Sequence, residues 1–299
     1  MKNTLYSLVF LSIVFCMSSC APDQKNTVRK EKIGKLETVK ADVEKFHFEV
    51  SGKQIEEGKI PYGSSVVLIL EGIEGFKETN GKINCDASIE VLNAKNESLV
   101  KLDSLFDKKY GNGMPVEKFT GLVELSLKCQ RPLRINESYK LVFTLKDKAS
   151  EAKLVMSETF VMSPTSGLTY TESGLTSDGF FFHLNSGVAA LTENTVDKGD
   201  TLYAYCSNLS GLESEKGMVR ADAAITLYNT DGDTLANFTD LYKEYEKDGM
   251  PAETVSELIS LQLTMPTTLK SKTPYHVVFI IGDKMGKGTL TARYNFVTK

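Results

Sequence analysis

Short runs in which apolar and polar residues alternate cover most of the chain after residue 42. In one run Cys85, Ala87 and Ile89 share one side, while Asp86 and Ser88 share the other, because successive side chains of a strand point to opposite faces. Turn residues separate the runs, which is typical of an antiparallel sandwich. The predicted strands lie near 43–50, 64–71, 84–93, 97–102, 120–129, 138–146 and 153–162, and again near 179–186, 200–207, 220–229, 233–238, 256–265, 274–282 and 289–298.

The two sets of runs are copies of one sequence, separated by 136 positions. Phe46-His47 matches Phe182-His183, and Gly113-Met114-Pro115 matches Gly249-Met250-Pro251, without a gap. A duplication of this kind sets the domain plan. Seven strands in each copy predict an all-β protein of two tandem immunoglobulin-like Greek-key sandwiches, each with one short helix before the fifth strand.

The rest of the chain divides by composition around sandwiches at 43–162 and 179–299. Residues 20–42 are rich in Lys, Glu, Asn and Thr and poor in aromatic residues. Such a segment buries too little apolar surface to order itself, so we expect a flexible tether. Residues 163–178 are rich in Ser, Thr and Gly. They predict a short linker that sets the two sandwiches end to end.

Segments 104–112 and 240–248 interrupt the strand pattern and predict the short helix of each copy. Ser104 and Asp240 suit the N-cap position, because their side chains accept hydrogen bonds from the first backbone N–H groups. The Gly-Met-Pro tripeptide that follows supplies a left-handed glycine, an apolar contact and a proline that ends the helix. A ligand-binding loop is the alternative interpretation.

The first nineteen residues predict an export signal. Lys2 is followed by an apolar run from Leu5 to Met17, and then by Ser18 and Ser19 before Cys20. A basic start, an apolar stretch and small residues before the cleavage point are typical of a secretory signal. The run is too short to favour a spanning helix. An ordinary signal peptide with a chance cysteine is the alternative to a lipid-modified one.

Ser18-Ser19-Cys20 resembles the lipobox of bacterial lipoprotein precursors. The resemblance implies cleavage before Cys20 and acylation of that cysteine, which would anchor the protein to a membrane without spanning it. Ala21 stands where lipoproteins of the inner membrane carry aspartate, which favours the outer membrane. An acidic cluster after the cysteine would resemble the surface-export signal of Bacteroidetes lipoproteins, but only Asp23 is present, so the membrane face is left open.

Three cysteines follow the signal region: Cys85, Cys129 and Cys206. An envelope location permits a disulfide between Cys85 and Cys129. The matching positions of the other copy hold apolar residues, namely Ala221, Met265 and Leu70. This comparison favours buried free thiols that pack as small apolar groups. No ligand spacing or nearby His indicates a metal site or a catalytic thiol.

His47 and His183 are the shared polar residues that most suggest chemistry. Alternation places both on the outer face of the first strand of each copy. The acidic residues common to both copies do not lie at ligand spacing from them, so no metal site is predicted. The chain has three His and none of the common nucleophile, zinc or phosphate-loop motifs. We therefore expect no enzyme and no cofactor.

Three other polar patterns are better explained as turns. Asp147 and Asp283, each followed by Lys, open the last hairpin of each copy, where Asp accepts backbone N–H groups. Residues 229–233 look like a calcium loop, but they lack its distal Glu and contain an Asp-Gly hairpin signal. Ser150 and Lys153 have the spacing of a nucleophile pair, but the other copy has no equivalent.

Tyr203 and Tyr205 distinguish the second copy, because their counterparts are Val67 and Ile69. Their strand is apolar on both faces and must be covered on both. The helix, the linker or the other domain could provide the cover; an exposed patch for a partner or for stacking on sugars is the alternative. Asp-Ser/Thr-Leu tripeptides resemble the O-glycosylation acceptors of Bacteroidetes, which implies modification at Ser104, Thr201 and Thr234.

The sequence thus predicts a membrane-anchored cell-envelope lipoprotein that acts as a non-enzymatic binding or scaffolding module. Its candidate contact surface comprises Tyr203, Tyr205, His183 and His47. The expected partners are the membrane, through lipid on Cys20, and a protein or glycan. A formal net charge of −4 with scattered basic residues argues against nucleic acid. A glycan-binding protein of a polysaccharide-uptake system is the alternative function.

Overall fold

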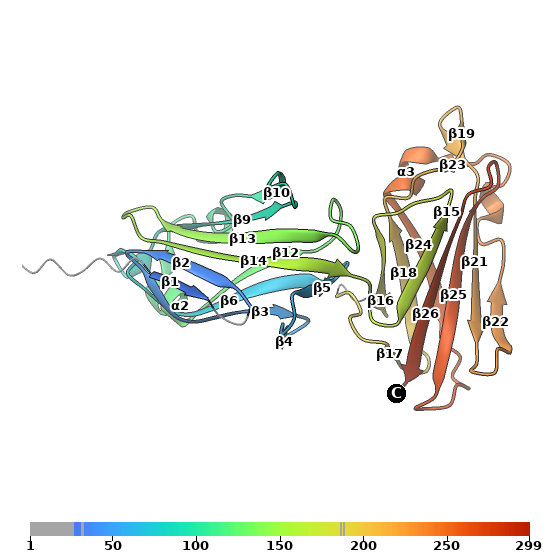
Figure 1. The fold of residues 1–299 in the computed structure, drawn as a ribbon, viewed down its shortest axis with the longest axis horizontal. Coiled ribbons are helices and arrows are strands. Elements are labelled where there is room, and N and C mark those ends of the chain that lie inside the picture. Colours follow the sequence, from blue (N-terminus) through green and yellow to red (C-terminus); the bar gives the residue numbers. More distant parts are fainter. Residues whose placement is uncertain (1–26, 31–32, 186, 188) are drawn as a thin grey trace, which may run out of the picture.

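The computed structural model describes residues 27–30, 33–185, 187 and 189–299. The predicted all-β class is confirmed, because two β-sandwiches contain nearly all of these residues (Figure 1). The predicted signal peptide, residues 1–19, and the predicted lipidation site, Cys20, lie outside the described residues. None of the described helices is long and apolar enough to cross a membrane.

The first sandwich packs two mainly antiparallel sheets face to face. One sheet contains β1 (Thr27–Lys30), β2 (Lys35–Val39), β5 (Lys59–Pro61), β9 (Cys85–Leu92), β10 (Ser98–Leu102), β13 (Ser138–Asp147) and β14 (Lys153–Ser163), in the order β1-β2-β14-β13-β9-β10. The other contains β3 (Asp42–Val50), β4 (Lys53–Gln54), β6 (Ser65–Glu74) and β12 (Leu122–Lys128), in the order β12-β6-β3-β4. β5 runs parallel to β14. The chain therefore switches sheets between β3 and β5, as in an immunoglobulin-like Greek key.

The second sandwich repeats this plan. Its larger sheet contains β15 (Leu168–Ser173), β17 (Thr195–Val196), β21 (Ala221–Tyr228), β22 (Thr234–Phe238), β25 (Pro274–Asp283) and β26 (Thr289–Thr298), in the order β15-β26-β25-β21-β22. The opposite sheet has the order β16-β18-β24, with β16 (Gly179–Leu184), β18 (Thr201–Ser207) and β24 (Leu258–Thr264). Each sandwich carries a small extra sheet: β7 (Glu78–Thr79), β8 (Lys82–Ile83) and β11 (Met114–Pro115) in the first, and β19 (Ser214–Glu215), β20 (Met218–Val219) and β23 (Met250–Pro251) in the second.

The duplication read from the sequence reappears in the strand register. Phe143 pairs with Ile89, and Phe279 pairs with Ile225, which are the same positions 136 residues later. The pairing of β12 with β6 recurs in the same way between β24 and β18. Because a shift of one residue would turn every side chain to the other face, this shared register gives the two cores the same inward rows.

The first strand of each copy departs from the separation of 136, whereas the strand it pairs with does not. Phe48 pairs with Leu68, and Phe182 pairs with Ala204. Because Leu68 and Ala204 are 136 positions apart, β3 and β16 correspond at a separation of 134. Phe48 lies 5.7 Å from Phe143 and Phe182 lies 5.8 Å from Phe279, between ring centroids, which confirms that they are equivalent. The gapless match of His47 with His183 is therefore wrong. Two extra residues follow β16, and the structural counterpart of His47 is Phe181.

The predicted tether contains two strands, β1 and β2, and the predicted linker contains β15. β2 lies within residues 20–42 and pairs with β14, and its Leu36 is fully buried. β15 lies within residues 163–178 and pairs with β26. Both predictions are wrong at these strands for one reason. An added strand that gains a neighbour's hydrogen bonds and buries one or two apolar side chains needs little apolar content of its own.

The helical segments are shorter and more numerous than predicted. In the first copy, α1 (Asp107–Tyr110) and α2 (Val116–Gly121) precede β12, and in the second, the 3₁₀ turn η1 (Lys243–Tyr245) and α3 (Ala252–Glu257) precede β24. Neither Ser104 nor Asp240 is an N-cap, because both have left-handed backbones, with φ of 56° and 55°. Gly113 and Gly249 have the expected positive φ, but the prolines that follow start the next helix.

Candidate functional site

The aromatic face of β16 and β18 is covered by the first sandwich. Figure 1 shows one end of the first sandwich against the side of the second at β16, so the two sandwiches do not lie end to end as predicted. Tyr62 and Ile135 of the first sandwich form one buried cluster with Phe181 and Ala190 of the second. The rings of Phe181 and Tyr205 stack with centroids 5.1 Å apart, and Tyr205 borders this cluster.

Polar contacts fix the same junction. The Tyr62 hydroxyl lies 2.7 Å from the Ser207 hydroxyl, and both groups are buried. Arg134 Nε donates to Asp178 Oδ1 at 2.9 Å, and the Ile135 N–H donates to the Asp178 carbonyl at 3.1 Å. Burial raises the worth of such hydrogen bonds, because an unmade one would leave a polar group without water. The junction is therefore a specific contact between the two sandwiches.

Close approach explains a glycine at the junction. Gly63 has a φ of 84°, and a Cβ atom built there would lie 2.5 Å from Phe181 Cγ. A larger side chain would push the two sandwiches apart. The sequence offers no signal for this role, because Gly63 touches its partner across more than a hundred residues.

The predicted contact surface is thus divided by the structure. Tyr205 and His183 lie at the junction, with His183 only 9% exposed and its Nε2 without a hydrogen-bond partner among the described residues. Tyr203 is half-buried and pairs with His183 across the two strands. His47 lies apart, on β3, where its Nε2 is 2.9 Å from Glu49 Oε1. The predicted outward side of His183 on its strand is confirmed, since Phe182 points into the core, but this outer face is buried at the junction instead of exposed.

The turn interpretations are confirmed for both Asp residues. Asp147 accepts hydrogen bonds from the Lys77 and Ala149 N–H groups at 2.7 and 2.8 Å. Asp283 accepts from Glu213 and Met285 in the same way, at 2.7 and 2.9 Å. The lysines that follow them also have a shared use, because Lys148 pairs with Asp107 and Lys284 pairs with Asp240. These pairs tie the last hairpin to the helical segment of each copy.

The remaining predicted sites differ in exposure. Ser104 and Thr234 are exposed, whereas Thr201 is half-buried and its hydroxyl lies 3.0 Å from that of Thr264. Cys85, Cys129 and Cys206 are buried free thiols, as the apolar counterparts in the other copy predict. Desolvation raises the pKa of each thiol to about 12. No cluster of three or more His, Cys, Asp or Glu that could hold a metal ion occurs among the described residues.

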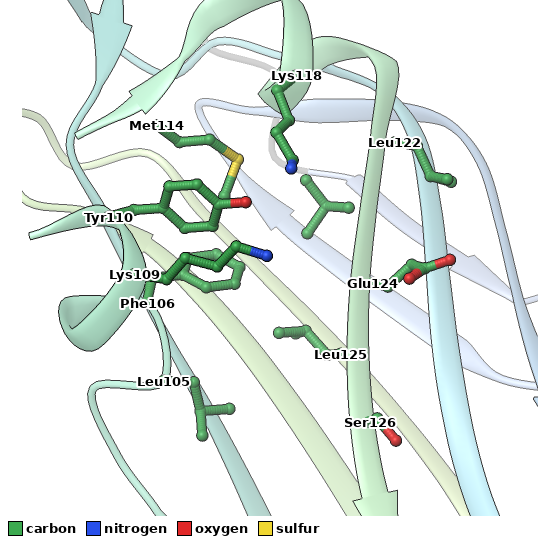
Figure 2. Close-up of a pocket in the computed structure, with 11 residues that line it drawn as sticks. Leu105, Phe106, Lys109, Tyr110, Met114, Lys118, Leu122, Glu124, Leu125 and Ser126 are labelled. Atoms are coloured by element: carbon green, nitrogen blue, oxygen red, sulfur yellow. The ribbon is translucent and has the colours of Figure 1, made fainter.

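A groove on the first sandwich is a further candidate site, and the sequence analysis missed it. Its volume is about 560 Å³, within the range of small-molecule and peptide sites. α1 and the residues around it form one wall, and β12 forms the other (Figure 2). The lining residues are Leu105, Phe106, Lys109, Tyr110, Met114, Lys118 and the consecutive run Leu122, Val123, Glu124, Leu125 and Ser126.

Two lysines give the groove its charge. Lys109 Nζ and Lys118 Nζ each lie 5.4 Å from the centre of the Tyr110 ring. Figure 2 shows both ammonium groups and the Tyr110 hydroxyl pointing into the space that faces β12. A hydrogen bond from Lys118, with a further contribution from Lys109, lowers the pKa of the Tyr110 hydroxyl. The groove therefore carries a positive field, and Glu124 is the one carboxylate that lines it.

The two lysines could not be singled out in the sequence. They are nine positions apart and belong to different helical segments, so no short motif contains them. A comparison of the copies does carry a signal, since the counterparts of Lys109 and Lys118 are Tyr245 and Thr254. Chain folding brings the lysines to one aromatic ring.

Comparison with known proteins gives this chain no family. No family model matches it, and no curated protein matches it. Solved structures with weak likeness include the C-terminal domain of wzt (13% identity, 45% of this chain, 79% of that chain, TM-score 0.31). They also include a DUF3823 family protein from Bacteroides ovatus (10%, 76%, 95%, 0.24) and the FN1–FN3 domains of chicken CNTN1 (8%, 85%, 67%, 0.22). At these TM-scores the likenesses carry no argument about function.

Proposed function

We propose that this protein is a lipid-anchored outer-membrane protein of the cell envelope that acts as a non-enzymatic binding module. The anchor is the acyl chain on Cys20, exposed by cleavage after Ser19. The sequence Ser18-Ser19-Cys20, behind a basic start and an apolar run, supports this anchor. Such lipidation attaches a folded protein to a bilayer and leaves its surface free for a partner.

The groove between α1 and β12 is the observation that carries the binding role. It is concave and mostly apolar, and it contains two lysines aimed into it. Sites of this kind hold a ligand through apolar contact and fix its orientation with a few polar groups.

A glycan partner has less support than a protein partner. The tyrosines of the second copy were the reason to consider sugars, because aromatic rings can stack on them. Tyr205 now stacks on Phe181 at the domain junction, and Tyr203 is half-buried beside it. We propose in addition that Ser104 and Thr234, both exposed, are the O-glycosylated positions, and that Thr201 is not; mass spectrometry of the native protein tests this.

The anchor is tested by changing Cys20→Ser. The unchanged protein, expressed in a Gram-negative host, should fractionate with the outer membrane, and globomycin should cause its uncut precursor to accumulate. The variant should leave the membrane fraction. Membrane association that survives both treatments would contradict the proposed anchor.

The binding role is tested by cross-linking in intact envelopes. A photoreactive residue replaces Ser126 in the groove, and a matched variant carries it at Gln262, the exposed counterpart on β24. We expect discrete cross-linked species from position 126 only. Equal cross-linking at both positions, or none at either, would argue against a binding role for the groove.

A further inference from the structure

The groove opens along the backbone edge of β12. Five consecutive residues, Leu122–Ser126, line it. Val123 and Leu125 face the core, whereas Leu122, Glu124 and Ser126 face outward. A cavity that touches both faces of one strand lies at the edge of that strand, because alternate side chains point in opposite directions.

That edge has no neighbouring strand in the described part of the chain. β12 pairs with β6 on one side and ends the sheet on the other. Such an edge presents unpaired backbone N–H and C=O groups, which can pair with another extended chain. Peptide recognition by strand addition uses these groups for affinity and nearby pockets for specificity.

The dimensions suit a short extended segment. Five residues of a strand extend roughly 14 Å between the first and last Cα atoms, at about 3.4 Å per residue. A peptide of about five residues could therefore pair along the lined part of β12. Phe106 and Met114, both buried, supply an apolar wall opposite that part.

The positive charge of the groove favours a bound peptide that carries an acidic side chain. Neither Lys109 nor Lys118 forms an ion pair with a carboxylate among the described residues, although both ammonium groups converge on Tyr110. Two lysines against Glu124 leave the lining with an excess of one positive charge. A carboxylate placed between the lysines would accept charge-assisted hydrogen bonds from both.

The same region of the second copy lacks these features. Tyr245 and Thr254 replace the two lysines, and Glu246 replaces Tyr110. Glu246 is itself within 3.7 Å of Lys284 and so has a cationic partner. β24 also ends its sheet in the described part of the chain, so both copies have a free strand edge, and Tyr245 and Thr254 replace the two lysines in the second copy.

We propose that an extended segment of a partner protein adds to the free edge of β12 and places an acidic side chain between Lys109 and Lys118. This inference rests on the proposed binding role of the groove and specifies its ligand. A second copy of this chain is a poor occupant, because its β12 would bring Lys128 as well as Glu124 to a lysine-lined edge.

The test uses an array of blocked pentapeptides. Each has Glu, Gln or Lys at the centre and all combinations of Val, Leu, Phe and Tyr around it. Peptides that bind should be concentrated in the Glu set. Methylation of the peptide's backbone nitrogens, which removes N–H donors and keeps the charge, should abolish their binding. Affinities of the leading peptides are then measured by titration calorimetry with the full chain.

Matched variants of the two copies test whether the peptide binds in the groove beside β12. Charge reversal at both lysines, Lys109→Glu with Lys118→Glu, should weaken binding of the leading Glu peptide by roughly tenfold or more, because it replaces two attractive charge interactions with repulsive ones. The corresponding pair in the second copy, Tyr245→Glu with Thr254→Glu, should leave binding unchanged. Both pairs lie on helical segments at the surface, and circular dichroism checks that each variant is folded.

Three outcomes would overturn the inference: no preference for Glu over Lys, binding that survives backbone methylation, or equal binding of free succinate. The last would reveal a simple anion site. Cross-links at position 126 together with any of these results would support the binding role of the groove and contradict only the proposal that its ligand is an extended acidic segment. Absence of both cross-links and peptide binding would remove the binding role as well.

Discussion

The two sandwiches have the same pattern of strand pairing and differ in the side chains on their outer faces. His47 in the first and Phe181 in the second occupy equivalent positions by register. His47 lies at the surface beside Glu49, whereas Phe181 is 5% exposed and packs against Tyr62. Differences in outward side chains, among them His47 against Phe181 and Ile69 against Tyr205, thus distinguish the docking face of the second copy. The inward rows, which make each sandwich fold, are the same in both.

On the side that carries the helical segments, the feature that suits a partner lies in the first copy instead of the second. The first copy places Lys109 and Lys118 in the groove beside β12, and the corresponding residues of the second copy are Tyr245 and Thr254. In the second copy the outer face of β16 and β18 packs against the first sandwich, and in the first copy the groove beside β12 is open. A duplicated domain can diverge in this way because surface substitutions away from the core change stability little.

The largest effect is expected for the reactivity of the three buried thiols. Their reaction rates test whether the two hydrophobic cores exclude solvent to the same degree. A pKa of about 12 for Cys85, Cys129 and Cys206, against an ordinary value near 9, means roughly a thousandfold less thiolate at about pH 8. All three should therefore resist Ellman's reagent in the folded protein and react once it unfolds. Peptide mapping along a urea series would show whether Cys206 reacts with the other two or apart from them. A fast-reacting thiol in the native protein would contradict burial.

A second test removes the residue that makes the docking face. Phe181→Ala should cost about 3 kcal/mol in the free energy of unfolding, because it deletes a buried aromatic ring at the junction. The equivalent change in the first copy, His47→Ala, should cost less than about 0.5 kcal/mol. Urea unfolding followed by circular dichroism measures both. Equal losses would mean that the two faces are not distinguished as the structure shows.

A smaller effect is expected for the ion pair across the junction. Asp178→Ala should cost about 1–2 kcal/mol, because it removes a largely buried acceptor for Arg134 Nε. The position equivalent by register, Glu44→Ala, is exposed and serves as the control. A double-mutant cycle with Arg134→Ala isolates the pair; a coupling energy near zero would assign the loss to other contacts of Asp178.

The smallest effect is a pH dependence at His183. Burial, with a contribution from Lys128, lowers its pKa in the folded state. Between that value and the ordinary value near 6.5, the unfolded chain binds more protons than the folded one, so stability falls as the pH falls. His183→Phe should lose less stability between about pH 7.5 and pH 5.5. His276, whose pKa is also lowered by burial, remains in both proteins; identical pH profiles would exclude a role for His183.

Much of the fold could be predicted because it depends on alternation, which is local. The inward rows of Val123, Leu125 and Leu127 are buried as the pattern predicts. β2 and β15 could not be predicted, since a strand that joins the sheet at its side takes its stability from the neighbour it pairs with. The candidate groove could not be predicted either, because Lys109 and Lys118 belong to separate segments.

By itself, the sequence determined the all-β class, the duplication and the burial of the cysteines, since each follows from the local alternation of residues or from matching two copies. Only the tertiary structure decided that β16 and β18 receive the first sandwich, that His47 corresponds to Phe181, and that two lysines meet beside a free strand edge. Register between strands and contact between domains depend on residues far apart in the chain. Local patterns contain no information about which of those residues will meet.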